Sequence, residues 1–220
     1  MRRTKEGAEK TRQRIMAAAL RTFDRRGIAH TTLTQIAAAA RVTRGAIYWH
    51  FRDKQALVRA IRSAVSLPLI DQADFTLLND RNSDPLQRIE RFLVDLIRAL
   101  EQDRRTRATF SVMSFKCEYV GEAAADLVEY ARKNERLRRV LTEVYKDAVA
   151  RGRLRRGLAP ELAAIETTVF LAGLLRLWLL DEGGIGVRKQ AAEIIAVHVA
   201  GRRANSVPLK HHAPGKPVLE

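Results

Sequence analysis

The sequence has almost no cysteine: Cys117 is the only one in 220 residues, so no disulfide can form within the chain. A chain of this kind is typical of a reducing compartment. Its N-terminal stretch is basic and lacks the apolar core of a signal peptide. The longest apolar run, residues 167–180, is interrupted by Arg176 and is shorter than the roughly 20 residues that a membrane span requires. We therefore expect a cytoplasmic protein with no membrane partner.

Catalytic motifs are missing as well. The chain has no glycine-rich phosphate loop, no zinc-ligand spacing and no nucleophile motif of the Gly-x-Ser-x-Gly type. Its five histidines are scattered, and the adjacent imidazoles of His211 and His212 do not make a structural metal site. We therefore expect no metal, no cofactor and no enzymatic activity.

Positive charge is abundant and unevenly placed. The net charge is +15, and residues 1–62 hold 15 Lys and Arg against four Asp and Glu, a net of +11, which leaves +4 for the remainder. A basic first domain attached to a nearly balanced second one is typical of a head that binds a polyanion. A merely soluble basic surface would spread its charge evenly. At 46% apolar residues, the chain can also bury a sizeable core.

Residues 32–51 form the pattern on which a functional interpretation depends. They are predicted to form two short helices with a tight turn between them. Thr32 or Thr34 can accept hydrogen bonds from the free amides of the first helix, as an N-cap residue does. Residues 41–43 interrupt the apolar pattern, and Thr43 is placed to cap the second helix. This is the layout of a helix-turn-helix.

The second helix, residues 44–50, separates two kinds of side chain. Ile47 and Phe51 are four residues apart, so both are expected to point into the core. The opposite side is rich in hydrogen-bond donors and aromatic rings: Arg44, Gly45, Tyr48, Trp49 and His50. That set suits a helix laid in the major groove of DNA. An ordinary helical hairpin in an all-α core would show the same local pattern.

The remaining segments also show helical periodicity, which predicts an all-α fold. Helices are expected over residues 9–26, from Asp53 to a break or kink at Pro68, from Pro85 onward, and over residues 104–118, 122–152, 160–181 and 187–200. Residues 1–8 are expected to be a mobile basic arm and residues 79–85 a loop. The resulting division is a three-helix DNA-binding domain over residues 1–62, a helical ligand-binding and dimerisation domain over residues 63–201, and a disordered tail over residues 202–220.

The helix expected over residues 160–181 is apolar on nearly every side, so it must be covered on more than one face. A second copy of the chain is a natural source of that cover, and a fully internal helix is the alternative. Arg176 lies in the middle of this helix and needs a partner or solvent. The partner could be an anionic ligand. It could also be Glu166 or Asp181 from the other copy of a dimer.

Several stretches carry a resemblance to a known family. TTLTQIAAAARVTR followed by GAIYWHFRDKQALV resembles the DNA-binding domain of the TetR family, and VTRGAIYWHF is typical of its branch that represses multidrug efflux pump genes. RTRATFSVMSFKCEYVGE and AGLLRLWLL resemble the pocket helix and the dimer helix of that branch. One departure is Arg41, where relatives commonly have glycine. Arg41 either offsets the cost of a left-handed turn through a phosphate contact, or the turn forms differently.

The resemblance implies a homodimeric repressor that binds double-stranded operator DNA and is released by a hydrophobic small-molecule inducer. The DNA contacts it implies are Thr32, Thr34, Thr43, Arg44, Gly45, Tyr48, Trp49, His50 and Lys54. The ligand-binding residues it implies are Phe110, Ser114, Cys117, Leu174 and Trp178, each of which has core packing as its ordinary alternative. A non-specific architectural DNA-binding protein is the competing interpretation. It would explain the basic head but gives no reason for the large, nearly balanced body.

Overall fold

The structure is a computed structural model that describes residues 2–80, 82–117, 124–181, 183 and 186–204, with only the backbone path described for residues 2–4, 66–75 and 79. Over these residues it confirms the expected all-α fold, with one isolated β-bridge and no strand. The helices are α1 (Arg2–Arg26), α2 (Leu33–Ala40), α3 (Arg44–His50), α4 (Lys54–Asp74), the π-helical turn η1 (Phe75–Asn79), α5 (Pro85–Gln102), α6 (Arg104–Phe115), α7 (Ala124–Ala150), α8 (Pro160–Leu180) and α9 (Val187–Ala200).

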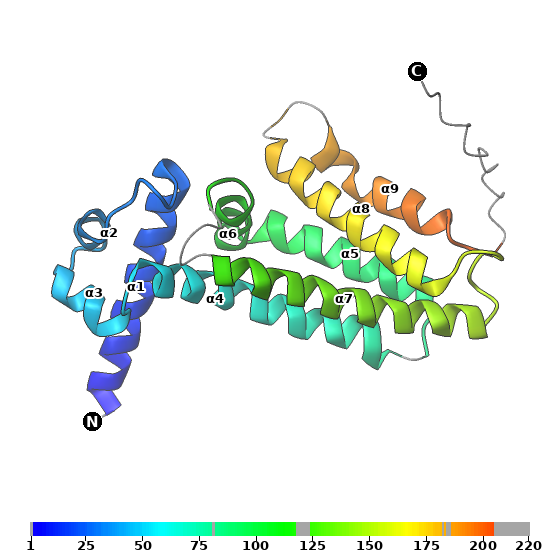
Figure 1. The fold of residues 1–220 in the computed structure, drawn as a ribbon, viewed down its shortest axis with the longest axis horizontal. Coiled ribbons are helices and arrows are strands. Elements are labelled where there is room, and N and C mark those ends of the chain that lie inside the picture. Colours follow the sequence, from blue (N-terminus) through cyan, green and yellow to red (C-terminus); the bar gives the residue numbers. More distant parts are fainter. Residues whose placement is uncertain (1, 81, 118–123, 182, 184–185, 205–220) are drawn as a thin grey trace, which may run out of the picture.

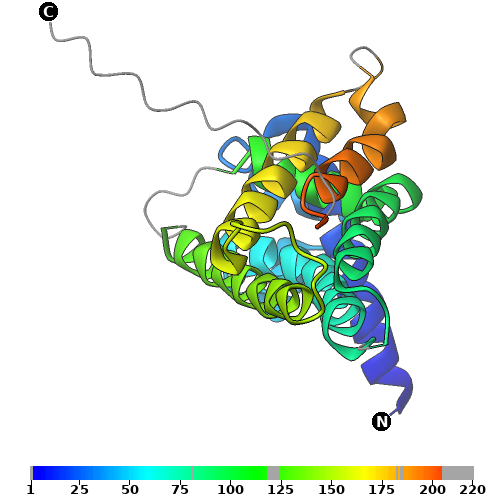
Figure 2. The ribbon, with the colours of Figure 1, turned by 90° about the vertical axis from the view of Figure 1, so that its right-hand side faces the viewer.

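The helices gather into a head and a body. Figure 1 shows α1, α2 and α3 at one end of the molecule, with α4 running from this head into the body and α6 lying at the junction. In the body, α7 contacts α8, α8 contacts α9, α9 contacts α5 and α5 contacts α7, so these four helices close into a bundle. Figure 2 looks along this bundle from its far end. Each part has its own cluster of buried apolar side chains.

Helix α1 begins seven residues earlier than the sequence predicted. The expected mobile arm is helical from Arg2 onward. Two contacts stabilise its first turns: Glu6 forms an ion pair with Lys10 at 2.8 Å, and the Thr11 hydroxyl donates to the Gly7 carbonyl at 3.0 Å. Both contacts join residues four apart, the spacing at which side chains meet on a helix.

Helix α4 continues through Pro68, so of the break or kink expected there the break is wrong and the kink stays a prediction. The helix ends at Asp74, where the π-helical turn η1 follows. A proline removes one backbone hydrogen bond, but this helix is 21 residues long and is held at both ends. Asp53 accepts from the Ala56 amide at 2.6 Å before its first turn, and Arg88 donates to the Leu77 carbonyl at 3.1 Å beyond its last. A continuous α4 therefore crosses the predicted domain boundary at residue 62.

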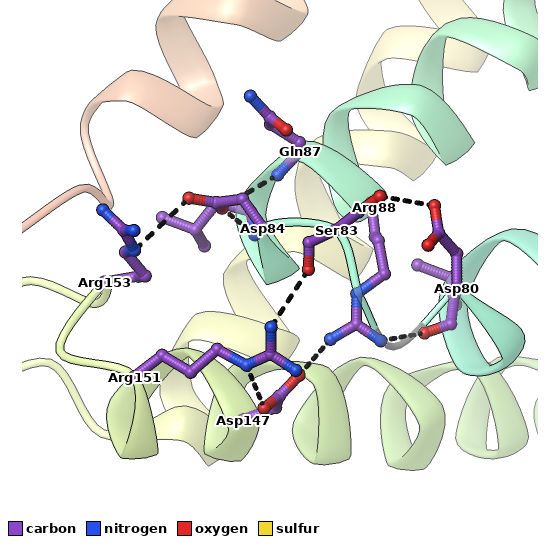
Figure 3. A network of polar contacts seen from close by, with 10 residues as sticks. Asp80, Ser83, Asp84, Gln87, Arg88, Asp147, Arg151 and Arg153 are labelled. Carbon is purple, nitrogen blue, oxygen red and sulfur yellow. Dashed lines mark hydrogen bonds and ion pairs between the residues drawn. The ribbon is translucent and has the colours of Figure 1, made fainter.

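A buried arginine fastens the far end of α4 and η1 to the bundle. Arg88 on α5 is 3% exposed and lies between the Leu77 carbonyl and the Asp147 carboxylate of α7, with which it forms an ion pair. Figure 3 shows this contact and the hydrogen bond that Asp147 accepts from Arg151 at 2.7 Å. Asp80 pairs with Arg91 at 3.1 Å. The two partners of Arg88, one in η1 and one in α7, therefore join these elements to α5.

The body extends past the predicted boundary at residue 201. The Arg155 amide donates to the Arg202 carbonyl and the Ala204 amide to the Arg153 carbonyl, both at 2.8 Å. The Arg202 side chain is buried and pairs with Glu166 at 3.2 Å. Residues 202–204 thus belong to the body, whereas residues 205–220 of the predicted tail lie outside the described residues.

Helix α8 is apolar on more than one side, as the sequence predicted. Leu171, Leu174 and Trp178 are buried in the bundle. A second set of large apolar side chains is exposed and forms what we call the α8–α9 face: Leu162, Ile165, Val169, Leu177 and Leu180, with Val197 on the neighbouring α9. Among the described residues, α8 alone is long and apolar enough to cross a membrane, but its contacts with α7 and α9 are those of a core helix.

A chain of polar groups is buried between α7, α8 and α9. The hydroxyl of Tyr145 lies 2.6 Å from that of Thr167, which lies 3.1 Å from Nε2 of His198. The His198 ring stacks on Phe170 with 3.7 Å between centroids. Burial and, after it, the charge of Arg202 lower the pKa of His198 to about 3. The imidazole is therefore neutral at physiological pH.

This lowered pKa predicts a pH-dependent stability. The unfolded chain binds a proton at His198 near pH 6.5, whereas the folded chain does not until about pH 3. Stability from the neutral imidazole is therefore present above pH 6.5 and is lost progressively as the pH falls toward 3. In thermal unfolding scans between pH 7.5 and 4.5, we expect the melting temperature to fall less steeply for His198→Gln than for the wild type. Parallel slopes would contradict this assignment.

Candidate nucleic-acid interface

Helix α2 begins with a capping box. The Thr32 hydroxyl accepts from the Gln35 amide at 3.2 Å, while the Gln35 side chain accepts from the Thr32 amide at 3.0 Å. Of the two threonines considered as the N-cap, the structure assigns that position to Thr32. Thr34 is exposed in the first turn. Ile36, Ala37 and Ala40 face the head core, so α2 is a small platform that supports the turn and α3.

The turn between α2 and α3 is left-handed at Arg41. This residue has φ 52° and ψ 49°, and it is the single non-glycine residue with positive φ in the described part of the chain. Its amide donates to Ala38 at 3.1 Å and the Val42 amide to Ala37 at 3.0 Å, which satisfies the last carbonyls of α2. The sequence left two alternatives, a left-handed turn or a turn of different geometry. The structure has the left-handed turn, which glycine adopts freely.

Arg41→Gly is expected to stabilise the protein by about 1 kcal/mol, because glycine avoids the clash of Cβ in the left-handed region. Arg41→Ala is the matched control, since it removes the charge but keeps the strain. Thermal unfolding would therefore show a higher melting temperature for the glycine variant and little change for alanine. Equal melting temperatures for the two variants would mean that the turn stores no such strain.

Helix α3 is held on one face and free on the other. The Thr43 hydroxyl accepts from the Ala46 amide at 3.1 Å, and Ile47 and Phe51 are buried, both as expected. On the outer face the Trp49 side chain is 73% exposed. Arg44, also on this face, donates to the Tyr48 hydroxyl at 2.9 Å.

Gly45 is also on the outer face of α3, and the chain itself gives no reason for a glycine there. A Cβ at this position would meet only the Thr43 hydroxyl, at 3.8 Å, which is ordinary contact. A helical glycine costs roughly 0.5–1 kcal/mol relative to alanine. Open space on the outer face of α3 is what a close approach of another molecule to the backbone requires.

Arg12 is a residue of this site that sequence reasoning missed. It reaches from α1 to donate to the carbonyl of His50 at 3.3 Å, and its guanidinium lies 4.4 Å from the centre of the Phe51 ring. Burial first, and then the charge of Arg12, lower the pKa of His50 below its ordinary value. Arg12 therefore holds the C-terminal end of α3 against α1. A sequence separation of 38 residues left no local pattern that could have revealed it.

Lys54 forms hydrogen bonds within the chain that the sequence did not predict. Its ammonium donates to the carbonyls of Ile28 and Thr31 at 2.8 and 3.0 Å, and more distantly to Ala29 at 3.4 Å. These contacts fix the loop before α2 to the first turn of α4. A phosphate would therefore have to replace one of these carbonyls in order to bind this ammonium.

The five expected ligand-binding residues are divided between the two parts of the protein. Leu174 and Trp178 are buried in the body core, and Phe110 packs against it. Cys117 packs instead against the head core, and Ser114 is exposed. The buried indole nitrogen of Trp178 has no hydrogen-bond partner within the described part of the chain.

Within the chain, Arg176 contacts α6, and its expected pairing with Glu166 or Asp181 across a dimer stays a prediction. Its guanidinium lies 4.8 Å from the centre of the Phe115 ring and donates to the Ser114 carbonyl at 3.5 Å, both in α6. Within the chain, Glu166 pairs with Arg202, and Asp181 accepts from the Arg188 amide at 3.0 Å. Since Arg176 is otherwise exposed, solvent satisfies much of its charge.

Head and body are joined by polar contacts at the junction. Lys116, at the end of α6, forms an ion pair with Asp24 of α1 at 2.8 Å, and its carbonyl accepts from the Ile28 amide at 3.2 Å. Arg62 of α4 pairs with Asp126 in the first turn of α7 at 3.0 Å, with side chains only 15% and 5% exposed. These contacts join α1 and α4, which pack in or lead from the head, to α6 and α7.

Comparison with known proteins gives this geometry a family. Residues 15–61 match the family model described as bacterial regulatory proteins, tetR family, and residues 84–200 match the C-terminal region of MAATS-type transcriptional repressors. The chain is 34% identical over 203 residues to the HTH-type transcriptional regulator AcrR of Shigella flexneri, covering 89% of this chain and 91% of that protein. It is 37% identical over 182 residues to TtgR of Pseudomonas putida, covering 82% and 85%.

A solved structure shares the same architecture. NalD of Pseudomonas aeruginosa, described as the secondary repressor of the MexAB-OprM multidrug efflux pump, superposes with a TM-score of 0.80 at 28% identity, covering 91% of this chain and 99% of NalD. These relatives are transcriptional regulators and not enzymes, in agreement with the expectation from the sequence. The chain belongs to the TetR family of helix-turn-helix transcriptional regulators.

Proposed function

We propose that this protein is a cytoplasmic repressor that binds operator DNA as a homodimer and controls a multidrug efflux pump operon, from which a hydrophobic small molecule releases it. The observation that carries the proposal is the outer face of α3. It presents Arg44, Gly45, Tyr48 and Trp49 to solvent in a domain whose net charge is +11. Such a helix can enter the major groove while the basic surroundings contact phosphates.

The contacts divide by chemistry. Arg44 is the residue best suited to a bidentate hydrogen bond with guanine, because its guanidinium is planar and sits in the first turn of α3. Gly45 allows the DNA to approach the helix closely. Tyr48, Trp49 and His50 lie where their rings and polar groups can contact the sugar-phosphate backbone of the DNA. Thr32, Thr34, Thr43 and Lys54 complete the proposed set from the ends of α2, α3 and α4.

Arg44→Ala is expected to change sequence preference, whereas Lys54→Ala is expected to weaken all duplexes alike. Loss of one bidentate contact corresponds to about 1–3 kcal/mol, or roughly 5- to 150-fold in affinity for operator over random DNA. Loss of a phosphate contact carries no sequence information. Competition binding with operator and random duplexes measures both effects. Equal losses on the two duplexes for both variants would contradict the division.

A melting curve for Lys54→Ala provides the control that the structure makes necessary. Lys54 also holds the carbonyls before α2, so its removal can lower stability as well as DNA affinity. If binding weakens at a temperature where the variant is still fully folded, the loss belongs to the DNA contact. A variant that binds normally once folded would remove Lys54 from the proposed set.

A homodimer explains two features: how the protein reads enough base pairs, and what buries the exposed apolar face of α8. One recognition helix reads few base pairs, so a twofold dimer reads two half-sites. The α8–α9 face supplies two helices from each copy for a four-helix interface. A ligand in the body would then release DNA by favouring a spacing of the two heads that does not match the operator, which requires only different affinities for the two states. The efflux target rests on the resemblance and on the likeness to NalD.

A further inference from the structure

A hollow of about 330 Å³ lies at the junction of head and body, between the C-terminal ends of α1 and α6. Figure 1 shows α6 beside the upper end of α1, away from α3. The residues that line the hollow are Arg25, Arg26, Gly27, Ala29, His30, Phe115, Lys116 and Cys117. Of the five residues expected to line a ligand site in the body, only Cys117 is among them, so this hollow is a separate feature.

The described residues that line the hollow carry positive charge and no carboxylate. Arg25 and Arg26 are exposed, and neither has an ion-pair partner among the described residues. The nearby Asp24 is already paired with Lys116 at 2.8 Å. Among the described residues, the charge of these two arginines at the opening is therefore not balanced by an ion pair. A guanidinium suits a carboxylate because its planar fork of N–H donors can form two parallel hydrogen bonds with the two carboxylate oxygens.

The lining of the hollow also includes two side chains without charge, an aromatic ring and a thiol. Phe115 and Cys117 are partly buried there, and Phe115 is the last residue of α6. Arg176 lies over the Phe115 ring at 4.8 Å, which adds a further cation close to this lining. A volume near 330 Å³ is at the lower end of the range for small-molecule sites, and the hollow is a shallow one that is widely open to solvent. It accommodates one ring with one charged group.

We propose that this junction hollow is a second small-molecule site, which binds a small aromatic monocarboxylate. The carboxylate pairs with Arg25 and Arg26, and the ring lies against Phe115 and Cys117. The site has walls from both parts of the protein, since α1 and its following loop belong to the head and α6 to the body. This ligand would bind at a place distinct from the hydrophobic inducer expected in the body.

Benzoate and benzamide are the matched probes, because they share ring and shape and differ in charge. Isothermal titration and thermal shift on the full-length protein, at constant ionic strength, should show benzoate binding at least fivefold more tightly than benzamide. Acetate, which lacks the ring, should bind more weakly than benzoate. The readout contains no DNA, so it succeeds or fails independently of the proposed repressor function.

Two double variants locate the site. Arg25→Gln with Arg26→Gln should weaken benzoate binding at least fivefold, whereas Arg14→Gln with Arg21→Gln removes the same charge from exposed positions of α1 outside the hollow and should leave it unchanged. Equal binding of benzoate and benzamide would overturn the proposal. So would equal losses in the two double variants, or binding unaffected by removal of Arg25 and Arg26.

Discussion

Val169→Glu is expected to convert the protein into monomers that no longer bind operator DNA tightly. Val169 is 66% exposed on α8 although it is surrounded along the helix by other exposed apolar side chains. In a twofold interface the same patch meets itself, so one substitution buries two carboxylates. Burial of an unpaired charge costs several kcal/mol, which exceeds what most single contacts contribute.

Light scattering after size exclusion measures the mass directly, and titration of a two-half-site operator measures the functional loss. Val149→Glu is the control, because Val149 is 51% exposed on α7 and does not belong to the α8–α9 face. We expect that control to remain dimeric and to bind normally. A Val169→Glu protein that is folded and still dimeric would place the interface elsewhere.

Asp126→Ala is expected to lower the free energy of unfolding by about 3 kcal/mol, because it leaves the charge of Arg62 buried without its partner. The pair is largely hidden from water, with side chains 15% and 5% exposed. Among the described residues, Asp126 is the one ion-pair partner of Arg62, and Nε of Arg62 is buried without a hydrogen-bond partner. The pair also joins α4, which carries the head, to the first turn of the body helix α7.

Urea denaturation with a double-mutant cycle separates the pair from its members. Arg62→Met combined with Asp126→Leu removes both charges and should recover much of the stability that Asp126→Ala loses. Asp95→Ala is the control, because Asp95 pairs at 3.7 Å with Arg98, whose side chain is 63% exposed, and ion pairs that water reaches contribute at most about 1 kcal/mol. Similar losses in Asp126→Ala and Asp95→Ala would contradict a special role for the buried pair.

Local chemistry explains which features could be predicted from the sequence. The caps at Thr32 and Thr43 and the inward pair Ile47 and Phe51 depend on residues a few positions apart, and the structure has them as expected. The helical start at Arg2 was missed because the basic composition of residues 1–8 suggested a frayed terminus. The contacts between residues four apart, such as Glu6 and Lys10, favour a helix instead.

Contacts between distant residues could not be predicted in this way. Arg12 reaches His50 across 38 positions, and Arg62 reaches Asp126 across 64. Helical periodicity states which face of a helix is apolar but not which helix covers it. The expected ligand-binding set shows the same limit, since Cys117 packs against the head core whereas Leu174 packs in the body. The resemblance supplied residue roles, and the structure supplies their neighbours.

The central claim is sequence-specific, ligand-responsive DNA binding, and a gel shift on the DNA upstream of this protein's own gene tests it most directly. The assay uses random duplex as competitor, two salt concentrations and a panel of hydrophobic antibiotics. We predict a complex that survives competitor and is released by at least one compound. A complex that random duplex abolishes, with only the steep salt dependence of phosphate contacts, would contradict the claim and favour an architectural DNA-binding protein.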